Sequence, residues 1–411
     1  MKINFSKLFR ENKYPVYINI LERFFFFLIF LVIAREYSAQ SFGELITVFS
    51  LANIFAIIFD LGIPLFLQKE FSSGEKKSPD IAVNAIAVSV FLFPVYFLLL
   101  TVYQQLIFPD LPFRLFAYTS ILVYIFSISN LISKALSGLK DFHSQFKALL
   151  FSRSFAFTFF IIFAVILKAE LSLLIIILTA GAVIQLSYLI RSLRLNHINL
   201  SLNYINTKTS KSILKLSLPL GLAVLFNFLY DKIDIILISK IIDFENTAFY
   251  SIGYGIYKSS ALIYSFLFIT GLNRISYLSR NKKAVRLFYK KYLSLLLPVC
   301  ITLTVVLFFF SGSIIEFFYT DKFYDSIIIL KILSFAVTGL ALNNLTGVML
   351  NGLGLYRQNM NVTFIGLILN IILNIIILPV YGIAGAAVIT VLTEYFIFTG
   401  DYIYLKKFKA I

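Results

Sequence analysis

Long apolar runs separated by short polar segments make up almost the whole chain. Runs of roughly 20 residues or more lie at 14–34, 44–68, 81–108, 114–137, 145–167, 171–190, 214–239, 246–272, 287–311, 326–350, 358–379 and 384–405. A run of this length allows an α-helix to cross the hydrocarbon core of a bilayer. The pattern therefore predicts an all-α polytopic membrane protein with about twelve transmembrane helices.

The basic residues lie mainly in every second segment between the runs. If the N-terminus is cytoplasmic, the cytoplasmic segments hold 26 of the 36 Lys and Arg residues, the outer segments hold six, and the runs hold four. Cytoplasmic loops of membrane proteins carry such an excess of Lys and Arg. We therefore expect a multi-pass protein with both termini in the cytoplasm.

Composition narrows the function classes. Sixty per cent of the residues are hydrophobic and 14% are charged, which is too apolar for a soluble chain of this length. The net charge of +16 follows from the cytoplasmic segments, so a nucleic-acid partner is not expected. The only cysteine, Cys300, allows neither an internal disulfide nor a Cys-based metal site. We predict no metal site and no cofactor.

The two halves of the chain show a repeat. The segment Leu136–Phe142 resembles Leu350–Tyr356, 214 residues later, and a Gln follows each segment. Because each half holds an even number of runs, the halves would have the same orientation in the membrane. We expect two parallel-repeat six-helix bundles around a central cavity, with an N-terminal lobe at 1–205 and a C-terminal lobe at 206–411.

One run combines apolar length with charge. Asp231, Lys232 and Asp234 interrupt the apolar run at 214–239. At 100° per residue, Asn227, Asp231 and Asp234 lie on one helical face. Ionisable side chains at membrane depth are costly and normally face a bundle interior or a water-filled cavity. The sequence thus predicts that this face is part of the functional site.

Several motifs together resemble a known family. They are Phe59–Gly62, Leu218–Pro219, Asp231–Asp234, Leu350–Arg357 and Leu369–Ala387. In these segments, and along essentially the whole chain, the sequence resembles Wzx-type polysaccharide-export flippases of the superfamily that includes MATE drug exporters. The resemblance implies a flippase of the bacterial cytoplasmic (inner) membrane. Its substrate would be an undecaprenyl-diphosphate-linked oligosaccharide for O-antigen or capsule synthesis, moved to the outer leaflet by alternating access.

Such a substrate needs cations for its phosphates. The basic side chains within the runs are Arg23, Arg153, Lys232 and Lys258, and we predict that they bind the diphosphate. Structural ion pairs, or side chains that extend to the membrane surface, remain the alternative.

Acidic and polar side chains complete the candidate site. Glu22, Asp231, Asp234 and Glu394 are candidates for coupling to H⁺ or Na⁺ or for structural pairing with the bases, and the residues leave both roles open. The candidates for a sugar path share amide or phenol groups on helical faces, and they are Asn227, Tyr254, Tyr257, Asn370 and Asn374. Hydrogen bonds between helices are the alternative role for the sugar-path group.

Two other functions remain to be weighed. A MATE-like exporter of cationic drugs would use the same scaffold, but Arg23 and Lys258 would repel cations. A membrane glycan polymerase or glycosyltransferase would require a sizeable outer loop, and every outer segment is short. We therefore expect a transporter and not an enzyme. Its expected partners are the lipid-linked oligosaccharide, membrane lipids, a coupling ion and membrane proteins of the same glycan pathway.

Overall fold

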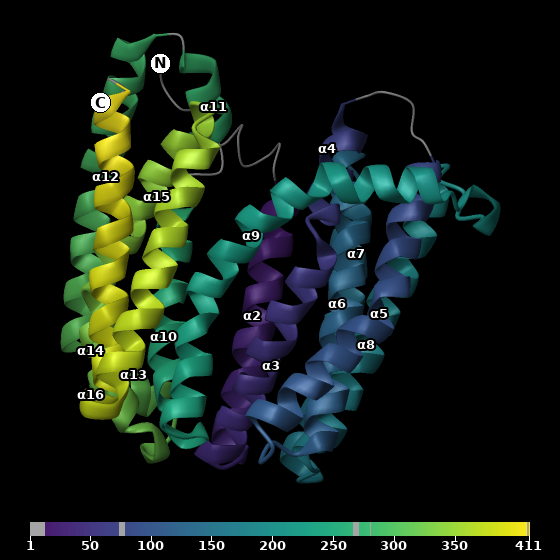
Figure 1. Cartoon of the computed structure of the whole chain (residues 1–411). Coiled ribbons are helices and arrows are strands. Elements are labelled where there is room, and N and C mark those ends of the chain that lie inside the picture. Colours follow the sequence, from purple (N-terminus) through teal and green to yellow (C-terminus); the bar gives the residue numbers. More distant parts are fainter. Residues whose placement is uncertain (1–12, 74–78, 266–270, 280, 409–410) are drawn as a thin grey trace. The chain divides into compact units, whose positions relative to one another are not determined.

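The structure is a computed structural model that describes residues 13–73, 79–265, 271–279, 281–408 and 411. The described residues form helices joined by short turns, without a strand (Figure 1). The chain forms two compact units, which comprise residues 13–38 and 48–225 (unit 1) and residues 39–47 and 226–411 (unit 2). The lobes predicted from the repeat, 1–205 and 206–411, stay a prediction.

Unit 1 contains the helices of the first half of the chain. They are α2 (Lys13–Glu36), most of α3 (Ala39–Asp60), α4 (Ile63–Ser72), α5 (Pro79–Ile107), α6 (Phe113–Gly138), α7 (Phe142–Ile161), the π-helical turn η1 (Ile162–Ile166), α8 (Leu171–Leu195), the 3₁₀ turn η2 (Leu202–Tyr204) and the first part of α9 (Thr207–Ile241).

Unit 2 contains the first turns of α3, the rest of α9 and all later elements. The later elements are α10 (Phe244–Ser265), α11 (Gly271–Leu278), α12 (Lys282–Phe309), α13 (Ser311–Phe318), the 3₁₀ turn η3 (Asp321–Phe323), α14 (Asp325–Ser334), α15 (Ala336–Gly352) and α16 (Tyr356–Lys407).

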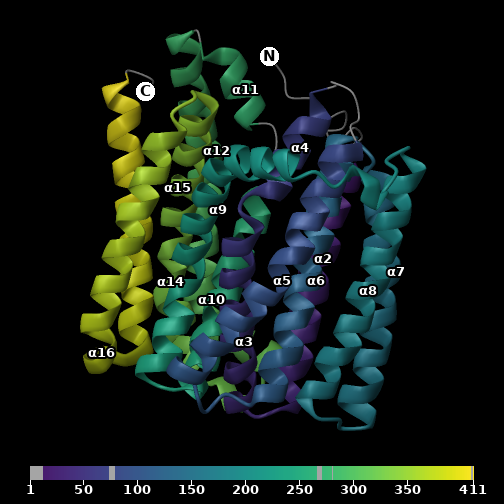
Figure 2. The ribbon, with the colours of Figure 1, turned by 45° about the vertical axis from the view of Figure 1, so that its right-hand side comes forward.

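The predicted membrane spans correspond to these helices. Among the described residues, nine helices are long and apolar enough to cross a membrane, and α14 with α15 forms a tenth span bent by 45°. The helix α16 contains two of the predicted runs, because its 52 residues are interrupted at Gly382, where φ is 57° and ψ is −152°. Glycine adopts such angles without steric cost, and the two arms of α16 run side by side (Figure 1 and Figure 2). The all-α polytopic fold with about twelve helices is confirmed.

The helix α10 is less apolar than these spans, although its 22 residues match a membrane span in length. Its polar side chains Tyr250, Tyr254 and Tyr257 are at most 5% exposed. They face the interior of unit 2, where other polar side chains replace water. The remainder of the predicted run 246–272 includes 266–270, which lie outside the described residues.

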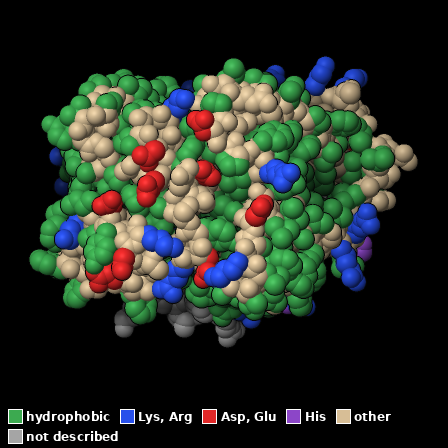
Figure 3. All heavy atoms as spheres, turned by 90° about the horizontal axis from the view of Figure 1, so that it is seen from below, with side chains coloured by type: hydrophobic (Ala, Val, Ile, Leu, Met, Phe, Trp, Pro, Cys, Tyr) green, Lys and Arg blue, Asp and Glu red, His purple; other side chains and the backbone are tan. Residues whose placement is uncertain are grey.

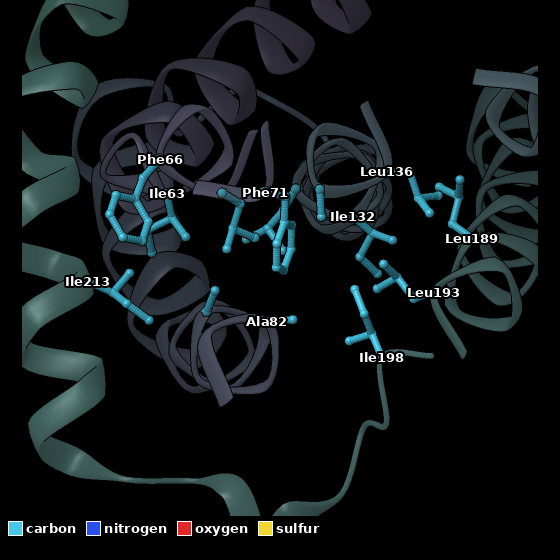
Figure 4. Close-up of a cluster of buried hydrophobic side chains, with 14 of the residues drawn as sticks. Ile63, Phe66, Phe71, Ala82, Ile132, Leu136, Leu189, Leu193, Ile198 and Ile213 are labelled. Carbon is cyan, nitrogen blue, oxygen red and sulfur yellow. The ribbon is translucent and has the colours of Figure 1, made fainter. Parts of the chain in front are cut away.

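The core of unit 1 is apolar. Side chains of α4, α5, α6 and α8 pack with Ile198 and Ile213 in one buried cluster (Figure 4). Leu67, Ala85, Ile132 and Leu189 in this cluster are at most 1% exposed. Moving one of the larger side chains from water into such a core stabilises the fold by roughly 1.5–3 kcal/mol. Moving it from lipid into the core contributes less, because lipid is also apolar. Packing against neighbouring helices therefore fixes the rotation of α4, α6 and α8.

One end of the helices carries charged side chains. Seen from the lower end of Figure 1, acidic and basic side chains lie among hydrophobic ones on the face of the molecule (Figure 3). In unit 1, Lys168, which follows η1, forms an ion pair with Glu36, the last residue of α2. Charged side chains at the ends of apolar helices are typical of a membrane–water interface.

The helix α9 contacts the turn between α3 and α4 through backbone atoms. Leu61 and Gly62 have φ angles of 51° and 76°, and the amide of Gly62 donates to Asp60 Oδ1 (2.7 Å). A Cβ added at Gly221 of α9 would lie 2.6 Å from the carbonyl carbon of Leu61. Only glycine at residue 221 allows this approach, since the neighbouring atoms belong to the backbone and cannot rotate away.

We therefore predict that Gly221→Ala destabilises the protein by about 1–3 kcal/mol, as overpacking does in other tight contacts. The measurement is the thermal unfolding temperature of the purified protein in detergent.

Gly255→Ala is the matched control. A Cβ at Gly255, on the exposed side of α10, meets no atom within 4 Å, so this change should leave the unfolding temperature unchanged or raise it. Equal unfolding temperatures for the two variants would show that the contact at Gly221 is not tight.

Candidate functional site

Four helices of unit 2 place polar side chains in one cluster. Asp231 and Asp234 lie one turn apart on α9, and Thr390 and Glu394 lie one turn apart on the second arm of α16. Side chains three or four residues apart lie on one helical face. We call Asp231, Asp234, Glu394 and the side chains bonded to them the acid network. Its other members are Lys232, Tyr250, Tyr254, Tyr257, Lys258, Asn343, Asn374 and Thr390.

Asp234 accepts hydrogen bonds from three neutral groups. Tyr250 Oη and Thr390 Oγ1 donate to Oδ2 at 2.7 and 2.8 Å, and Asn374 Nδ2 donates to Oδ1 at 3.0 Å. The carboxylate is 3% exposed. Among the described residues, no Lys, Arg or His lies within ion-pair distance of it. Asp234 is therefore a buried carboxylate that is hydrogen-bonded without an adjacent cation.

Lys258 pairs with two carboxylates. Its Nζ lies 3.1 Å from Asp231 Oδ1 and 3.5 Å from Glu394 Oε1. Asp231 also contacts Lys232 Nζ at 3.0 Å. Glu394, which is fully buried, accepts further bonds from Tyr257 Oη (3.0 Å) and Asn343 Nδ2 (2.9 Å). Lys258 thus connects α9 and α16 through α10.

Two aromatic rings of α10 complete this part of the network. Tyr254 Oη donates to Asp231 Oδ1 at 2.8 Å. The Lys258 ammonium lies 5.3 Å from the centroid of the Tyr254 ring and 5.4 Å from that of Tyr257. A ring face attracts a cation at this distance. Three acids and two lysines give the acid network a formal charge of −1 when all are ionised, so it is no cationic site.

The structure places the predicted sugar-path residues in different surroundings. Tyr254, Tyr257 and Asn374 belong to the acid network, and Asn370 Oδ1 accepts from Asn374 Nδ2 at 3.1 Å. Asn227, one turn before Asp231, is exposed on α9. The network therefore includes the predicted interhelical bonds, and a path for sugars stays a prediction.

The remaining predicted residues lie in unit 1. Glu22 and Arg23 are exposed on α2. Arg153 of α7 is 3% exposed, with its guanidinium carbon 4.9, 5.5 and 4.7 Å from the ring centroids of Phe25, Phe26 and Phe126. Its Nε is buried without a hydrogen-bond partner. Among the described residues, no carboxylate lies within 4.0 Å of the charged groups of Arg23 or Arg153.

Several buried polar residues were not predicted. Thr390 binds a carboxylate of the acid network, and Tyr230 Oη donates to Thr393 Oγ1 at 3.1 Å. Asp401 is fully buried near the end of α16. One signal in the sequence could have found Thr390 and Asp401. They lie four and seven residues from Glu394, which places all three on one helical face.

Two family models match the sequence. The model of the polysaccharide biosynthesis protein family matches residues 13–272, and the MatE model matches residues 219–376.

Two archaeal proteins are similar in sequence. Uncharacterized membrane protein MJ1375 of Methanocaldococcus jannaschii is 27% identical over 418 residues, which cover 95% of this chain and 96% of that protein. Uncharacterized membrane protein MJ1068 of the same organism is 29% identical over 126 residues, 31% of this chain. That match spans only 25% of the length of MJ1068.

Solved transporters have the same fold. The inward-facing conformation of a multidrug resistance MATE family transporter of the MOP superfamily matches with a TM-score of 0.77 and 13% identity, over 97% of this chain and 94% of that one. Lipid II flippase MurJ in an inward closed conformation matches with a TM-score of 0.73 and 17% identity, over 95% and 86%. A MOP superfamily transporter from Pyrococcus furiosus has a TM-score of 0.65 and 13% identity, over 96% and 94%.

The twelve-helix fold and its buried ionisable groups define a multi-pass membrane protein with the fold of MOP superfamily transporters. More specifically, the chain belongs to the polysaccharide biosynthesis protein family. The resemblance inferred from the sequence motifs is thereby confirmed.

Lys258→Met should destabilise unit 2. Removing Lys258 leaves two carboxylates without their shared cation, and we predict that the free energy of unfolding falls by about 3 kcal/mol. This value is at the lower end of the range for buried ion pairs, because Lys258 and Asp231 are partly exposed. The measurement is the thermal unfolding temperature in detergent.

Lys232→Met is the matched control, because Lys232 contacts only Asp231 among the carboxylates of the network. It should cost about 1 kcal/mol or less. Adding Glu394→Gln to Lys258→Met should recover part of the loss. Equal losses for the two lysine variants, without recovery in the double variant, would contradict a shared ion pair.

Proposed function

We propose that the protein is a flippase that moves a polyprenyl-diphosphate-linked oligosaccharide from the inner to the outer leaflet of the cytoplasmic membrane of a bacterium. The protein acts by alternating access, without a chemical step, and both termini face the cytoplasm. The observation that carries this proposal is the pair of arginines in unit 1, Arg23 and Arg153, which have no carboxylate partner among the described residues.

An arginine within a membrane helix is costly unless an anion or water compensates its charge. The guanidinium group binds phosphate oxygens through two parallel hydrogen bonds, which suits a diphosphate. The lysines of unit 2 are already paired with Asp231 and Glu394. The predicted diphosphate ligands therefore separate into two groups, with Arg23 and Arg153 as the primary ones.

The two arginines take different parts in this proposal. Arg23 is exposed on α2 and reaches the diphosphate directly. Arg153 lies beneath the rings of Phe25, Phe26 and Phe126, so it meets the substrate only in a conformation that uncovers it. Lys232 and Lys258 bind phosphate only after they exchange their carboxylate partners.

The family membership and the fold shared with the lipid II flippase support a lipid-linked substrate. The polar side chains Asn227, Tyr254, Tyr257, Asn370 and Asn374 supply amides and phenols for a hydrated sugar chain, while the prenyl chain stays among membrane lipids. Partners from the same glycan pathway supply the substrate and receive it.

We further propose that Asp234 binds the coupling ion, a proton or Na⁺. Its ligand set fits a small cation because, among the residues that the structure describes, Asn374 Oδ1 is buried without a partner and no base lies beside Asp234. Carboxylate, amide and hydroxyl oxygens are hard ligands of the kind that such cations prefer. Asp231 and Glu394 then serve as structural partners of Lys258, and the exposed Glu22 is the remaining candidate for the ion.

A MATE-like exporter of cations is the second candidate. The formal charge of −1 in the acid network and the MatE match at residues 219–376 favour it. The unpaired arginines of unit 1 argue against it, because they repel cationic substrates.

The first prediction concerns Arg23. In the native host without this gene, the wild-type protein should restore surface polysaccharide, whereas Arg23→Ala at matched expression should reduce it about tenfold or more, as expected for a lost charge-assisted bond. The measurement quantifies surface glycan together with the polyprenyl-diphosphate-linked unit, which should accumulate on the inner leaflet.

Arg114→Ala is the control, because Arg114 is exposed in the first turn of α6, where the predicted run 114–137 begins. It should restore surface glycan fully. Full rescue by Arg23→Ala would return Arg23 to a structural role. Normal glycan with altered sensitivity to cationic drugs in the deletion strain would favour the exporter.

The second prediction concerns Asp234. Binding of an ion to the folded protein raises the unfolding temperature. Replacing choline chloride by NaCl, or lowering the pH, should raise this temperature by more for the wild type and for Asp231→Asn than for Asp234→Asn. A response of Asp234→Asn equal to that of the wild type would exclude Asp234 as the ion site.

A further inference from the structure

Asp401 is a buried acid outside the acid network. It lies in the last two turns of α16 and is 0% exposed. Its Oδ1 has no hydrogen-bond partner in the described part of the chain, and its Oδ2 contacts Thr346 Oγ1 of α15 at 3.3 Å. Among the described residues, no Lys, Arg or His forms an ion pair with it.

The one donor near Asp401 is shared. Thr346 Oγ1 also lies 3.1 Å from the carbonyl oxygens of Leu342 and Asn343. A hydroxyl has a single proton to donate, so it cannot satisfy two carbonyls and a carboxylate at once. Asp401 in its ionised form would therefore have at most part of one hydrogen bond.

A second acceptor lies beside the first. A Cβ built at Gly347 of α15 would lie 3.8 Å from Asp401 Oδ2 and 3.5 Å from Asn359 Oδ1. The amide of Asn359 donates through Nδ2 to Asn351 Oδ1 (3.2 Å), which leaves its oxygen as an acceptor. A carboxylate and an amide oxygen thus lie around the bare backbone of Gly347, and the amide donor beside them, Asn359 Nδ2 at 3.7 Å from the same Cβ, donates to Asn351.

A proton on Asp401 resolves this shortage. The carboxyl O–H then donates to Thr346 Oγ1, and the Thr346 hydroxyl is free to donate to Leu342 or Asn343. The same proton removes the charge, and an ionised carboxylate without a partner at membrane depth is costly. A buried polar group is stable only when it is hydrogen-bonded, so protonation satisfies both requirements.

The charged and titratable groups around Asp401 offer no substitute for the proton. On α16 itself, Glu394 lies two turns earlier and is bonded to Lys258, Tyr257 and Asn343. The neighbour Tyr402 packs on Tyr289 of α12. The bases of α16, which are Arg357 in its first turn and Lys406 and Lys407 in its last, are exposed, and Lys406 Nζ lies 4.9 Å from the centroid of the Tyr402 ring. The α15 residues that contact Asp401 and Asn359 are not ionisable.

We propose that Asp401 is a proton-binding site of unit 2. Its carboxyl group is protonated in this conformation and exchanges its proton with the water at this end of the helices. One turn of α15 joins it to the acid network, because Thr346 contacts the carbonyl oxygen of Asn343 while the Asn343 side chain binds Glu394. The site depends neither on the identity of the transported substrate nor on ion binding at Asp234.

Infrared difference spectroscopy of the purified full-length protein tests the site. The wild type should show a protonated-carboxyl band that shifts in D₂O and disappears as the pH is raised from about 5 to about 9, the range that buried carboxyls reach. Asp401→Asn should lose this band, whereas Asp234→Asn and Glu394→Gln should retain it. Thr346→Val should shift its frequency, because it removes the acceptor of the carboxyl proton.

Three results would overturn the proposal. The first is an identical carboxyl spectrum for the wild type and Asp401→Asn, which would mean that Asp401 is ionised. The second is a band that persists at every pH and does not shift in D₂O, which would mean a fixed structural proton. The third is loss of the band on adding Na⁺ at constant pH, which would indicate a metal cation. If Asp401→Asn does not fold, Asp401→Glu must instead move the band.

Discussion

Neutralisation of buried carboxylates is the constraint on which the structure of unit 2 depends. Asp234 and Glu394 lie where neither water nor lipid compensates their charge, and Asp231 is only partly exposed, so each carboxylate needs donors from neighbouring helices. Lys258 serves two of them, and tyrosine, threonine and asparagine side chains serve the third. The rotation of α9, α10 and α16 about their axes is fixed by these bonds, because a turn of any helix would leave a carboxylate without partners.

The two units use their ionisable groups differently. In unit 2 the charges are compensated within the protein, and the bonds extend over four helices. In unit 1 the core is apolar, and Arg153 packs against three phenylalanine rings. A protein that binds an anion in one unit and an ion in the other can couple the two, since each ligand changes the charge that its unit must bury.

The sequence predicted the spans because apolar length is a property of each segment alone. The break between the two arms of α16 was also visible, since Pro379 and Gly382 interrupt the run. Shared helical faces were predicted for Asp231 with Asp234 and for Asn370 with Asn374. Which carboxylate Lys258 pairs with depends on the packing of α10 against α9 and α16, and no local pattern contains that information.

Asp401 shows the same limit. A carboxylate in the last turns of a membrane helix is usually hydrated, and the spacing from Glu394 places Asp401 on the same helical face without showing that it is buried. Only the packing of α15 across it, with glycine at residue 347, shows that water is excluded. Arg153 is a similar case, because three phenylalanine rings from two other helices cover a side chain that reads as interfacial in the sequence.

The most direct test of the proposed function is movement of lipid in a purified system. The full chain is reconstituted in liposomes with a polyprenyl-diphosphate-linked saccharide that carries a fluorescent sugar, and a membrane-impermeant quencher is added outside. The account predicts that the quencher removes the fluorescence of probe from both leaflets when the protein is present. Without the protein, only the fluorescence of outer-leaflet probe should be lost. Inner-leaflet probe that stays protected in the presence of folded protein, while a cationic dye crosses the same membrane, would contradict it.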